Sequence, residues 1–188
     1  MSTVPSELDR RFREAAAAAG LLDVGYDLVE TPIGSLLVAA TPRGVCRISY
    51  DADPDEQAEL LARTHGVRVL RSPRVVDEAR RELDEYFAGK RERFDLALDL
   101  TGAAEFTRDV LGQLARVPYG EVTTYGHLAA TVGRPRAARA VGTVMNRNPI
   151  PIVLPCHRVV GSTGSLVGYG GGLERKQALL QLEGASLF

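Results

Sequence analysis

The first hundred residues have a hydrophobic pattern whose period changes several times. Segment 6–20, SELDRRFREAAAAAG, has helical spacing, with Ser6 as the N-cap and Gly20 as the stop. The apolar positions on one side of this helix are Leu8, Phe12 and Ala15 or Ala16. The pattern predicts a helix that forms an N-terminal extension, residues 1–22.

From residue 25 onward, strand-like runs are separated by two turn signals. TPIG and PRG combine proline and glycine, as hairpin turns do. In the third run, Cys46, Ile48 and Tyr50 alternate with polar residues, which directs Cys46 to the inward face of a strand. We therefore expect hairpin-linked strands, with Cys46 packed in the core.

The rest of this half mixes helical and strand-like patterns. The expected elements are a helix at 54–64, a strand at 67–70, a helix at 73–88 closed by Gly89, and a strand at 94–100. Residues 23–102 are therefore expected to form one α+β domain, and no chemical motif is evident in it.

The second half begins with three helical patterns. The first has its apolar positions at Phe106, Val110, Leu114 and Val117, and a PYG turn ends it. The second has Thr124 as its cap and an apolar side of Tyr125, Leu128, Ala129 and Val132. The third has Pro135 in its first turn and an inward side of Ala137, Ala140, Val141, Val144 and Met145.

The last two of these helices form a helix-turn-helix candidate, because about four residues including a glycine join them. The polar side of the second helix carries Arg136, Arg139, Thr143 and Arg147. Ala138 and Gly142 leave its exposed surface nearly bare. Its backbone could therefore approach a groove closely while the arginines reach phosphates or the base stack.

Charge is divided unevenly between the two halves of the 188-residue chain. The net charge of −1 combines −5 in residues 1–100 with +4 in residues 101–188. Between residues 120 and 160, Glu121 is the only acid, and the arginines are Arg134, Arg136, Arg139, Arg147 and Arg158. This segment suits a polyanion such as nucleic acid, and a solvated basic face is the alternative.

The segment PCHRVVG places Cys156 beside His157. Neighbouring cationic or hydrogen-bonding groups can lower the pKa of a thiol, and the thiolate is the reactive form. A small buried core side chain is the alternative role for Cys156. If the segment is extended, the two neighbouring side chains point to opposite sides, so a water molecule or a sharp turn must join them.

Glu183 lies at an unfavourable place near the end of a helix. It shares the apolar side with Leu179 and Leu180, and its charge opposes the helix dipole there. A partner such as His157 would explain this position, whereas a solvated surface glutamate is the default.

Several classes of protein are disfavoured by what the sequence contains. The two cysteines are too few for a disulfide framework, and no four-ligand zinc spacing occurs, so we expect no metal site. His65 and His127 are interpreted as surface or turn residues, and Tyr119 as packing at a turn. With no secretory pattern and no apolar run of about 18 residues, a cytoplasmic protein outside the membrane is expected.

Three motifs together resemble the O6-alkylguanine-DNA alkyltransferase family, also called methylated-DNA–protein cysteine methyltransferases. They are VPYGEVTTYGHLA, RPRAARAVGTVMNRNPIPIVLPCHRVVG and GYGGGLERKQALLQLEG. TPIGSLLVAAT and ELDEYFAGKRERFDLALDL are similar to the family's N-terminal domain. The resemblance implies an α+β fold: an α/β-roll domain resembling ribonuclease H at 23–102, and a winged-helix-like helix-turn-helix domain at 103–188.

The resemblance also implies a role for each matching residue. Cys156 would accept the alkyl group, His157 would relay its proton through water, and Glu183 would orient His157. Asn148 would brace the active-site turn. The residues implied for substrate binding are Tyr125, Val159, Tyr169 and Gly170. Those implied for DNA binding are Arg139, as a finger that fills the gap in the duplex, with Tyr125, Arg136, Ala138 and Gly142.

The implied activity is repair of double-stranded DNA that contains O6-alkylguanine. The protein would bind the minor groove, flip the base and move the alkyl group to Cys156. No second nucleophile or cofactor is evident to remove that group, so each molecule should act once. A monomer is expected. A cysteine hydrolase and a non-catalytic DNA-binding regulator are the two other classes considered.

Overall fold

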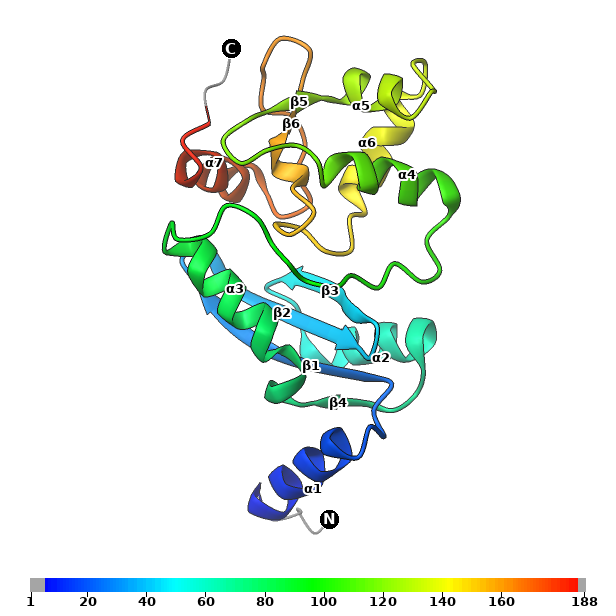
Figure 1. Cartoon of the computed structure of the whole chain (residues 1–188), viewed down its shortest axis with the longest axis vertical. Helices are drawn as coiled ribbons and strands as arrows, with labels where there is room; N and C mark the ends of the chain where they lie inside the picture. The colour runs from blue at the N-terminus through cyan, green and yellow to red at the C-terminus, as the bar shows by residue number, and fades with distance from the viewer. Residues whose placement is uncertain (1–5, 186–188) are drawn as a thin grey trace. The chain divides into compact units, whose positions relative to one another are not determined.

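The computed structural model of the protein describes residues 6–185 (Figure 1). The elements up to the middle of the chain are α1 (Ser6–Ala18), β1 (Val24–Thr31), β2 (Gly34–Thr41), β3 (Gly44–Tyr50), α2 (Pro54–His65), β4 (Val69–Arg71), the 3-10 helix η1 (Pro73–Val76) and α3 (Asp77–Phe87). Those that follow are α4 (Glu105–Leu114), β5 (Thr123–Thr124), α5 (Tyr125–Thr131), α6 (Ala138–Asn146), the 3-10 helix η2 (Cys156–Arg158), β6 (Val159–Val160) and α7 (Leu173–Leu182).

These elements divide into two compact units. The first unit contains the residues up to Asp84 together with Asp95–Thr101. The second contains Glu85–Phe94 together with the residues from Gly102 onward. Helix α3 therefore begins in the first unit and ends in the second.

The first unit is built on a four-stranded sheet of order β3-β2-β1-β4 (Figure 1). Strands β1, β2 and β3 are antiparallel neighbours, and β4 pairs with β1 in parallel. Gly34 has φ 109° and Gly44 has φ 135°, conformations that suit glycine because it lacks a Cβ. The two predicted hairpins are therefore confirmed.

A helix covers each face of this sheet. Successive residues of a strand point to opposite sides, so neighbouring residues of β1 show which helix lies on which face. Leu61 of α2 belongs to a cluster on one face that also contains Val24, Tyr26, Leu37, Ala39 and Cys46. Asp27, next to Tyr26 on β1, points to the other face and forms an ion pair with Arg80 of α3. Cys46 is buried and its Sγ lies 3.5 Å from the carbonyl oxygen of Ala39, which confirms its packing role.

Two predictions for the first unit were wrong in part. Residues 94–100 form no strand: only Leu98 makes an isolated bridge, to Val45. The Asp99 side chain accepts hydrogen bonds from Thr41, Arg43 and the Thr101 amide, which tie this segment down at one point. The short predicted strand 67–70 is also displaced, since β4 begins at Val69.

His65 differs from one of its two predicted alternatives, because its side chain is only 8% exposed. Its Nδ1 lies 3.8 Å from Oδ2 of Asp99, a carboxylate that is itself buried. The His65 side chain is therefore not a surface group. Its place at the end of α2, directly before Gly66, agrees with the other predicted alternative, a residue at a turn.

Helix α1 is confirmed, but its apolar side is not a core face. Leu8 is 58% exposed and Phe12 is 63% exposed, whereas Ala16 is buried. Gly20 follows the helix with φ 64°, as its predicted role as a stop requires. The predicted cap involves the Ser6 side chain, which lies outside the described residues.

The second unit contains the predicted helix pair, α5 and α6, packed with α4 (Figure 1). Thr124 Oγ1 accepts a hydrogen bond from the His127 amide at 3.1 Å, so Thr124 caps α5 as predicted. The buried side chains on the two helices are Leu128, Ala129, Val141, Val144 and Met145. The helix-turn-helix arrangement of this segment is thus present.

Three local predictions in this unit were wrong. Helix α6 begins at Ala138, so Pro135 belongs to the preceding turn rather than to the first helical turn. Ala140 is exposed rather than inward, because it lies at the edge of the stripe that Val141, Val144 and Met145 bury on α6. Helix α4 ends at Leu114, so Val117 lies beyond it.

Candidate alkyl-acceptor site

Asn148 organises the turn that precedes Cys156. Its Nδ2 donates hydrogen bonds to the carbonyl oxygen of Leu154 at 2.7 Å and to Sγ of Cys156 at 3.1 Å. Its Oδ1 accepts from the Ile150 amide at 3.1 Å. Within this turn Ile152 has φ 74°, a strained conformation for a β-branched residue. One side chain therefore holds both the strained turn and the sulfur atom.

Cys156 begins a single 3-10 turn, η2, that also contains His157 and Arg158. The extended conformation considered from the sequence is therefore wrong, and the sharp turn is the geometry present. Cys156 is only 4% exposed, and burial raises the pKa of its thiol to about 11. Hydrogen bonds from Asn148 and Tyr169 and the charge of Lys176 act in the opposite direction on this pKa.

His157 is fully buried and pairs with Glu183. Its Nε2 lies 2.8 Å from Oε1 of Glu183, and the glutamate is ionised at neutral pH, so Nε2 carries the proton and donates. Nδ1 is then the unprotonated nitrogen, and it makes no hydrogen bond within the described part of the chain. Burial lowers the pKa of His157 and Glu183 raises it. The imidazole therefore offers Nδ1 as a base.

Glu183 accepts hydrogen bonds from three segments of the second unit. Besides His157, its carboxylate accepts from the Tyr86 hydroxyl at 2.6 Å and from the Gly120 amide at 3.4 Å. Arg158 donates to both oxygens, from Nε to Oε2 at 2.8 Å and from Nη2 to Oε1 at 2.9 Å. Burial opposes ionisation, but these donors lower the pKa of Glu183 to about 2. The predicted pairing of Glu183 with His157 is present.

Arg158 was wrongly counted among the arginines that face a polyanion. It is only 5% exposed, and besides Glu183 its Nη1 donates to the Val117 carbonyl oxygen at 2.6 Å. The charge count could not show this, because the burial of an arginine depends on a carboxylate 25 residues away. The one feature of the sequence that could have indicated its burial is its position directly after His157.

Lys176 is a second buried charge that sequence reasoning missed. Its Nζ donates to the carbonyl oxygens of Val159 at 2.6 Å and Val167 at 2.8 Å, and burial lowers its pKa to about 8. Lys176 stands four residues before Leu180 and seven before Glu183, on the same side of α7. The spacing that singled out Glu183 therefore marked Lys176 as well.

Of the residues predicted to hold the substrate, Tyr125 and Tyr169 lie beside this thiol. Burial and the proximity of Cys156 raise the pKa of Tyr125, and Tyr169 hydrogen-bonds to Cys156. Val159 is fully buried on β6, where its carbonyl oxygen already accepts from Lys176. Gly170 is exposed, and a Cβ there would lie 3.3 Å from the carbonyl oxygen of Asn146 at the end of α6.

The arginines on the predicted DNA-binding side of α6, and directly before and after this helix, are open to solvent. Arg136, Arg139 and Arg147 are exposed, and Ala138 and Gly142 are half-buried. A Cβ at Gly142 would make only ordinary contact, at 3.9 Å, with the Tyr125 ring. Arg134 is exposed as well, with its guanidinium 5.1 Å from the centre of the Phe106 ring.

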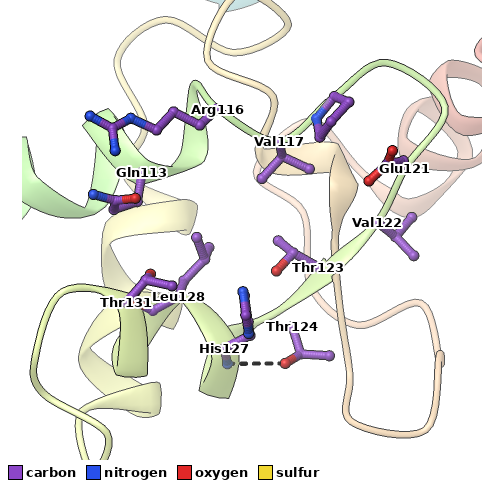
Figure 2. Close-up of a pocket in the computed structure, with 11 residues that line it drawn as sticks. Gln113, Arg116, Val117, Glu121, Val122, Thr123, Thr124, His127, Leu128 and Thr131 are labelled. Carbon is purple, nitrogen blue, oxygen red and sulfur yellow. Dashed lines mark hydrogen bonds between the residues drawn. The ribbon is translucent and has the colours of Figure 1, made fainter.

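A pocket of about 500 Å³ lies elsewhere in the second unit, between the end of α4, the following loop and α5 (Figure 2). Its lining residues are Gln113, Arg116, Val117, Pro118, Glu121, Val122, Thr123, Thr124, His127, Leu128 and Thr131. None of the predicted site residues lines it. Arg116 and Glu121 give it charges of both signs, so it lacks the uniform charge expected of a phosphate site.

Within residues 6–185, no cluster of three or more histidine, cysteine or acidic side chains is suited to hold a metal ion. Over the same range, no helix is both long and apolar enough to cross a bilayer.

The fold and site define a two-unit α+β protein in which a helix-turn-helix unit also carries a buried cysteine and a histidine–glutamate pair. The family model described as "6-O-methylguanine DNA methyltransferase, DNA binding domain" matches residues 105–185. The model described as the ribonuclease-like domain of the same protein matches residues 24–100. These matches confirm the predicted fold class.

Individual relatives match most of the chain. It is 42% identical over 158 residues to the methylated-DNA–protein-cysteine methyltransferase of Methanosarcina barkeri, covering 84% of this chain and 96% of that protein. It is 44% identical over 160 residues to the protein of the same name from Mycolicibacterium paratuberculosis, covering 85% and 92%. The chain belongs to the methylated-DNA–protein-cysteine methyltransferase family.

Solved structures agree with this assignment. The crystal structure of Mycobacterium tuberculosis O6-methylguanine methyltransferase is similar with a TM-score of 0.75 at 37% identity, covering 86% of this chain and 93% of that chain. The structure of Mycobacterium tuberculosis OGT in complex with DNA has a TM-score of 0.75 at 39% identity, covering 85% and 92%.

Proposed function

We propose that this protein repairs DNA by transferring an alkyl group from O6 of guanine to Cys156. The observation that carries the proposal is the place of the Cys156 thiol, which is hydrogen-bonded to Asn148 and directly followed by the buried His157–Glu183 pair, in the unit that also holds the helix-turn-helix. Family membership supports the reaction class, because the relatives carry the name of a cysteine methyltransferase that acts on methylated DNA.

The proposed reaction begins with loss of the thiol proton. A water molecule carries this proton from Sγ of Cys156 to Nδ1 of His157, and Glu183 stabilises the resulting imidazolium. The thiolate then attacks the alkyl carbon in line with the bond to O6. The carbon–sulfur bond forms as the carbon–oxygen bond breaks, and its electron pair stays on the guanine. The guanine anion then takes up a proton from water, and the His157 imidazolium returns its own proton to water, which leaves neutral guanine in the DNA. The protein keeps a stable thioether, so each molecule acts once.

The proposed recognition of DNA uses the exposed side of α6. Arg136 and Arg139 are free of the buried network and can approach a duplex, and the small Ala138 and Gly142 permit close contact in the minor groove. Arg139 would fill the gap left by the flipped guanine. Tyr125 and Tyr169, beside Cys156, would contact the base, with the Gly170 N–H near O6 and the Val159 carbonyl oxygen at the guanine edge.

The proposal includes three properties that were predicted from the sequence and remain predictions. The protein would act as a monomer, it would need no cofactor or metal, and it would work in the cytoplasm. Double-stranded DNA containing O6-alkylguanine would be its partner.

Mass spectrometry of the intact protein after mixing with an O6-methylguanine duplex tests the proposed function. We expect one added methyl group, located on Cys156 by peptide mapping, and unmodified guanine in the product DNA. A cysteine hydrolase would release product without retaining the methyl group, and a DNA-binding regulator would show no mass change. Either result would reject the proposal.

A further inference from the structure

Tyr86 lies at the C-terminal end of α3, where the chain passes into the second unit. Its side chain is fully buried, and its hydroxyl donates to Oε1 of Glu183 at 2.6 Å. Residues 85–94 pack with the second unit, although the ribonuclease-like family model spans them. A segment that the ribonuclease-like family model spans therefore belongs to the second unit and contributes a side chain to the buried network around His157.

We propose that Tyr86 is a positioning residue of the His157–Glu183 pair, whose hydroxyl fixes Oε1 of Glu183 and moderates how strongly that oxygen holds a proton on His157. The use of this pair in alkyl transfer rests on the proposed function. The contact between Tyr86 and Glu183 does not.

Three donors compete for a single oxygen atom. Oε1 of Glu183 accepts from the Tyr86 hydroxyl, from Nε2 of His157 and from Nη2 of Arg158. Each donor withdraws negative charge from the same oxygen, so a donor at 2.6 Å weakens the interaction available to the others. Removing the Tyr86 hydroxyl should therefore strengthen the hydrogen bond from His157.

The charges around this oxygen keep Tyr86 in its donating form. Burial and the negative Glu183 raise the pKa of Tyr86, so the phenol stays neutral at any pH at which the protein works. His157 itself faces Glu183, Arg158 and Lys176, and only Glu183 favours its protonated form. Changing a neutral hydroxyl leaves these three charges in place.

The surroundings of Tyr86 make a clean substitution available. Its ring packs against Phe87 and Phe94, each with centroids 5.3 Å away, and edge-on against Tyr119 at 6.1 Å. Tyr86→Phe keeps this aromatic cluster and removes only the donor. Tyr119→Phe is the matched control, because its hydroxyl donates to the Leu182 carbonyl oxygen at 3.0 Å rather than to Glu183.

Nuclear magnetic resonance of the imidazoles tests the proposal directly. The chain has three histidines. Replacing His65 and His127 in turn removes their signals from the spectrum, and the signals that remain belong to His157. In protein labelled with ¹⁵N-histidine, we expect Tyr86→Phe to move the His157 Nε2–H resonance downfield at pH 7. We also expect it to raise the His157 titration midpoint by about half a pH unit or more. Tyr119→Phe should leave both near their wild-type values.

Three outcomes would overturn the proposal: His157 signals in Tyr86→Phe that overlay those of the wild type, a shift in the opposite direction, or an equal shift in both variants. A purely structural role for Tyr86 would lower the thermal midpoint without moving the His157 resonances. Neither the resonance measurement nor the thermal measurement involves alkylated DNA. Failure of the proposed function would therefore show separately, as absence of methyl transfer to the wild-type protein.

Discussion

Arg158 and Glu183 form a two-point ion pair with both side chains out of solvent. Nε and Nη2 of the arginine donate to the two carboxylate oxygens at 2.8 and 2.9 Å, and the exposed fractions of the side chains are 6% and 0%. Because the planar guanidinium matches both oxygens, the carboxylate has a fixed orientation toward His157. Much of the buried charge in the site is balanced by this one contact.

Breaking that pair should destabilise the protein. Arg158→Met keeps much of the side-chain volume but leaves Glu183 as a buried charge without its main counterion, so the free energy of unfolding should fall by about 3 kcal/mol. Urea denaturation at pH 7 measures this. Arg136→Met, at an exposed position, serves as the control and should change stability by less than about 0.5 kcal/mol. Equal effects would show that Arg158 contributes no more than a surface charge.

Acidification should remove the contribution of Glu183 to stability. Its folded pKa of about 2 lies below its ordinary value near 4.5, so the contribution is fully present above pH 4.5 and is lost as pH falls through about 2. The difference in unfolding free energy between wild type and Glu183→Gln should therefore be of order 3 kcal/mol at pH 7 and shrink toward acid. Other carboxylates are common to both proteins and cancel. A difference independent of pH would contradict the ionised state of Glu183.

Cys156→Ala should abolish methyl transfer while the protein still binds alkylated duplex, since binding is assigned to α5 and α6. Cys46→Ala is the matched control and should retain full transfer. Cys46 is buried in the sheet core and burial raises its pKa to about 12. Intact mass and gel-shift measurements on both variants check this. Methyl gained by Cys156→Ala at any other residue would refute the assignment.

Arg139→Ala should separate base flipping from chemistry. Unstacking and unpairing a base costs a few kcal/mol, and a side chain that fills the gap offsets part of that cost. Transfer from duplex DNA should slow by about tenfold or more, whereas reaction with free O6-benzylguanine should stay near the wild-type rate. Single-turnover rates of the wild type and of Arg139→Ala on both substrates test this prediction. Equal losses would point to misfolding or to a direct chemical role.

Glu183→Gln should shift the pH dependence of transfer. Without the negative charge, the imidazolium of His157 is less stable, so the apparent pKa of Cys156 rises. The rate should drop at neutral pH and recover in part in alkaline buffer, where hydroxide removes the thiol proton. Single-turnover rates with free O6-benzylguanine from about pH 6 to 9.5 keep DNA binding out of the comparison. A profile that overlays the wild type would rule out the relay.

Local sequence determined most of the elements and part of the site. Proline and glycine at the turns separated the strand-like runs that became β1 to β3, and alternating apolar residues set the inward side of β3. Hairpins are local, and their turns need particular backbone angles. Helical spacing and the Thr124 cap specified α5 for the same reason. Glu183 stood out because a charge on an apolar helix side needs a partner, and PCHRVVG set Cys156 and His157 side by side.

Tertiary structure alone decided which arginines of the basic segment are buried and which partners the buried charges bind. Arg158 and Arg139 are both arginines in one basic segment, yet the fold buries the first against Glu183 and leaves the second exposed. Residues 94–100 have a strand-like pattern, but only Leu98 finds a strand partner. Tyr86 reaches Glu183 across 97 positions of the chain. Hydrogen bonds and ion pairs between distant residues depend on where packing brings the backbone. Local spacing can mark a charge on an apolar helix side, as it does for Glu183 and Lys176, but it does not identify the partner that the charge binds.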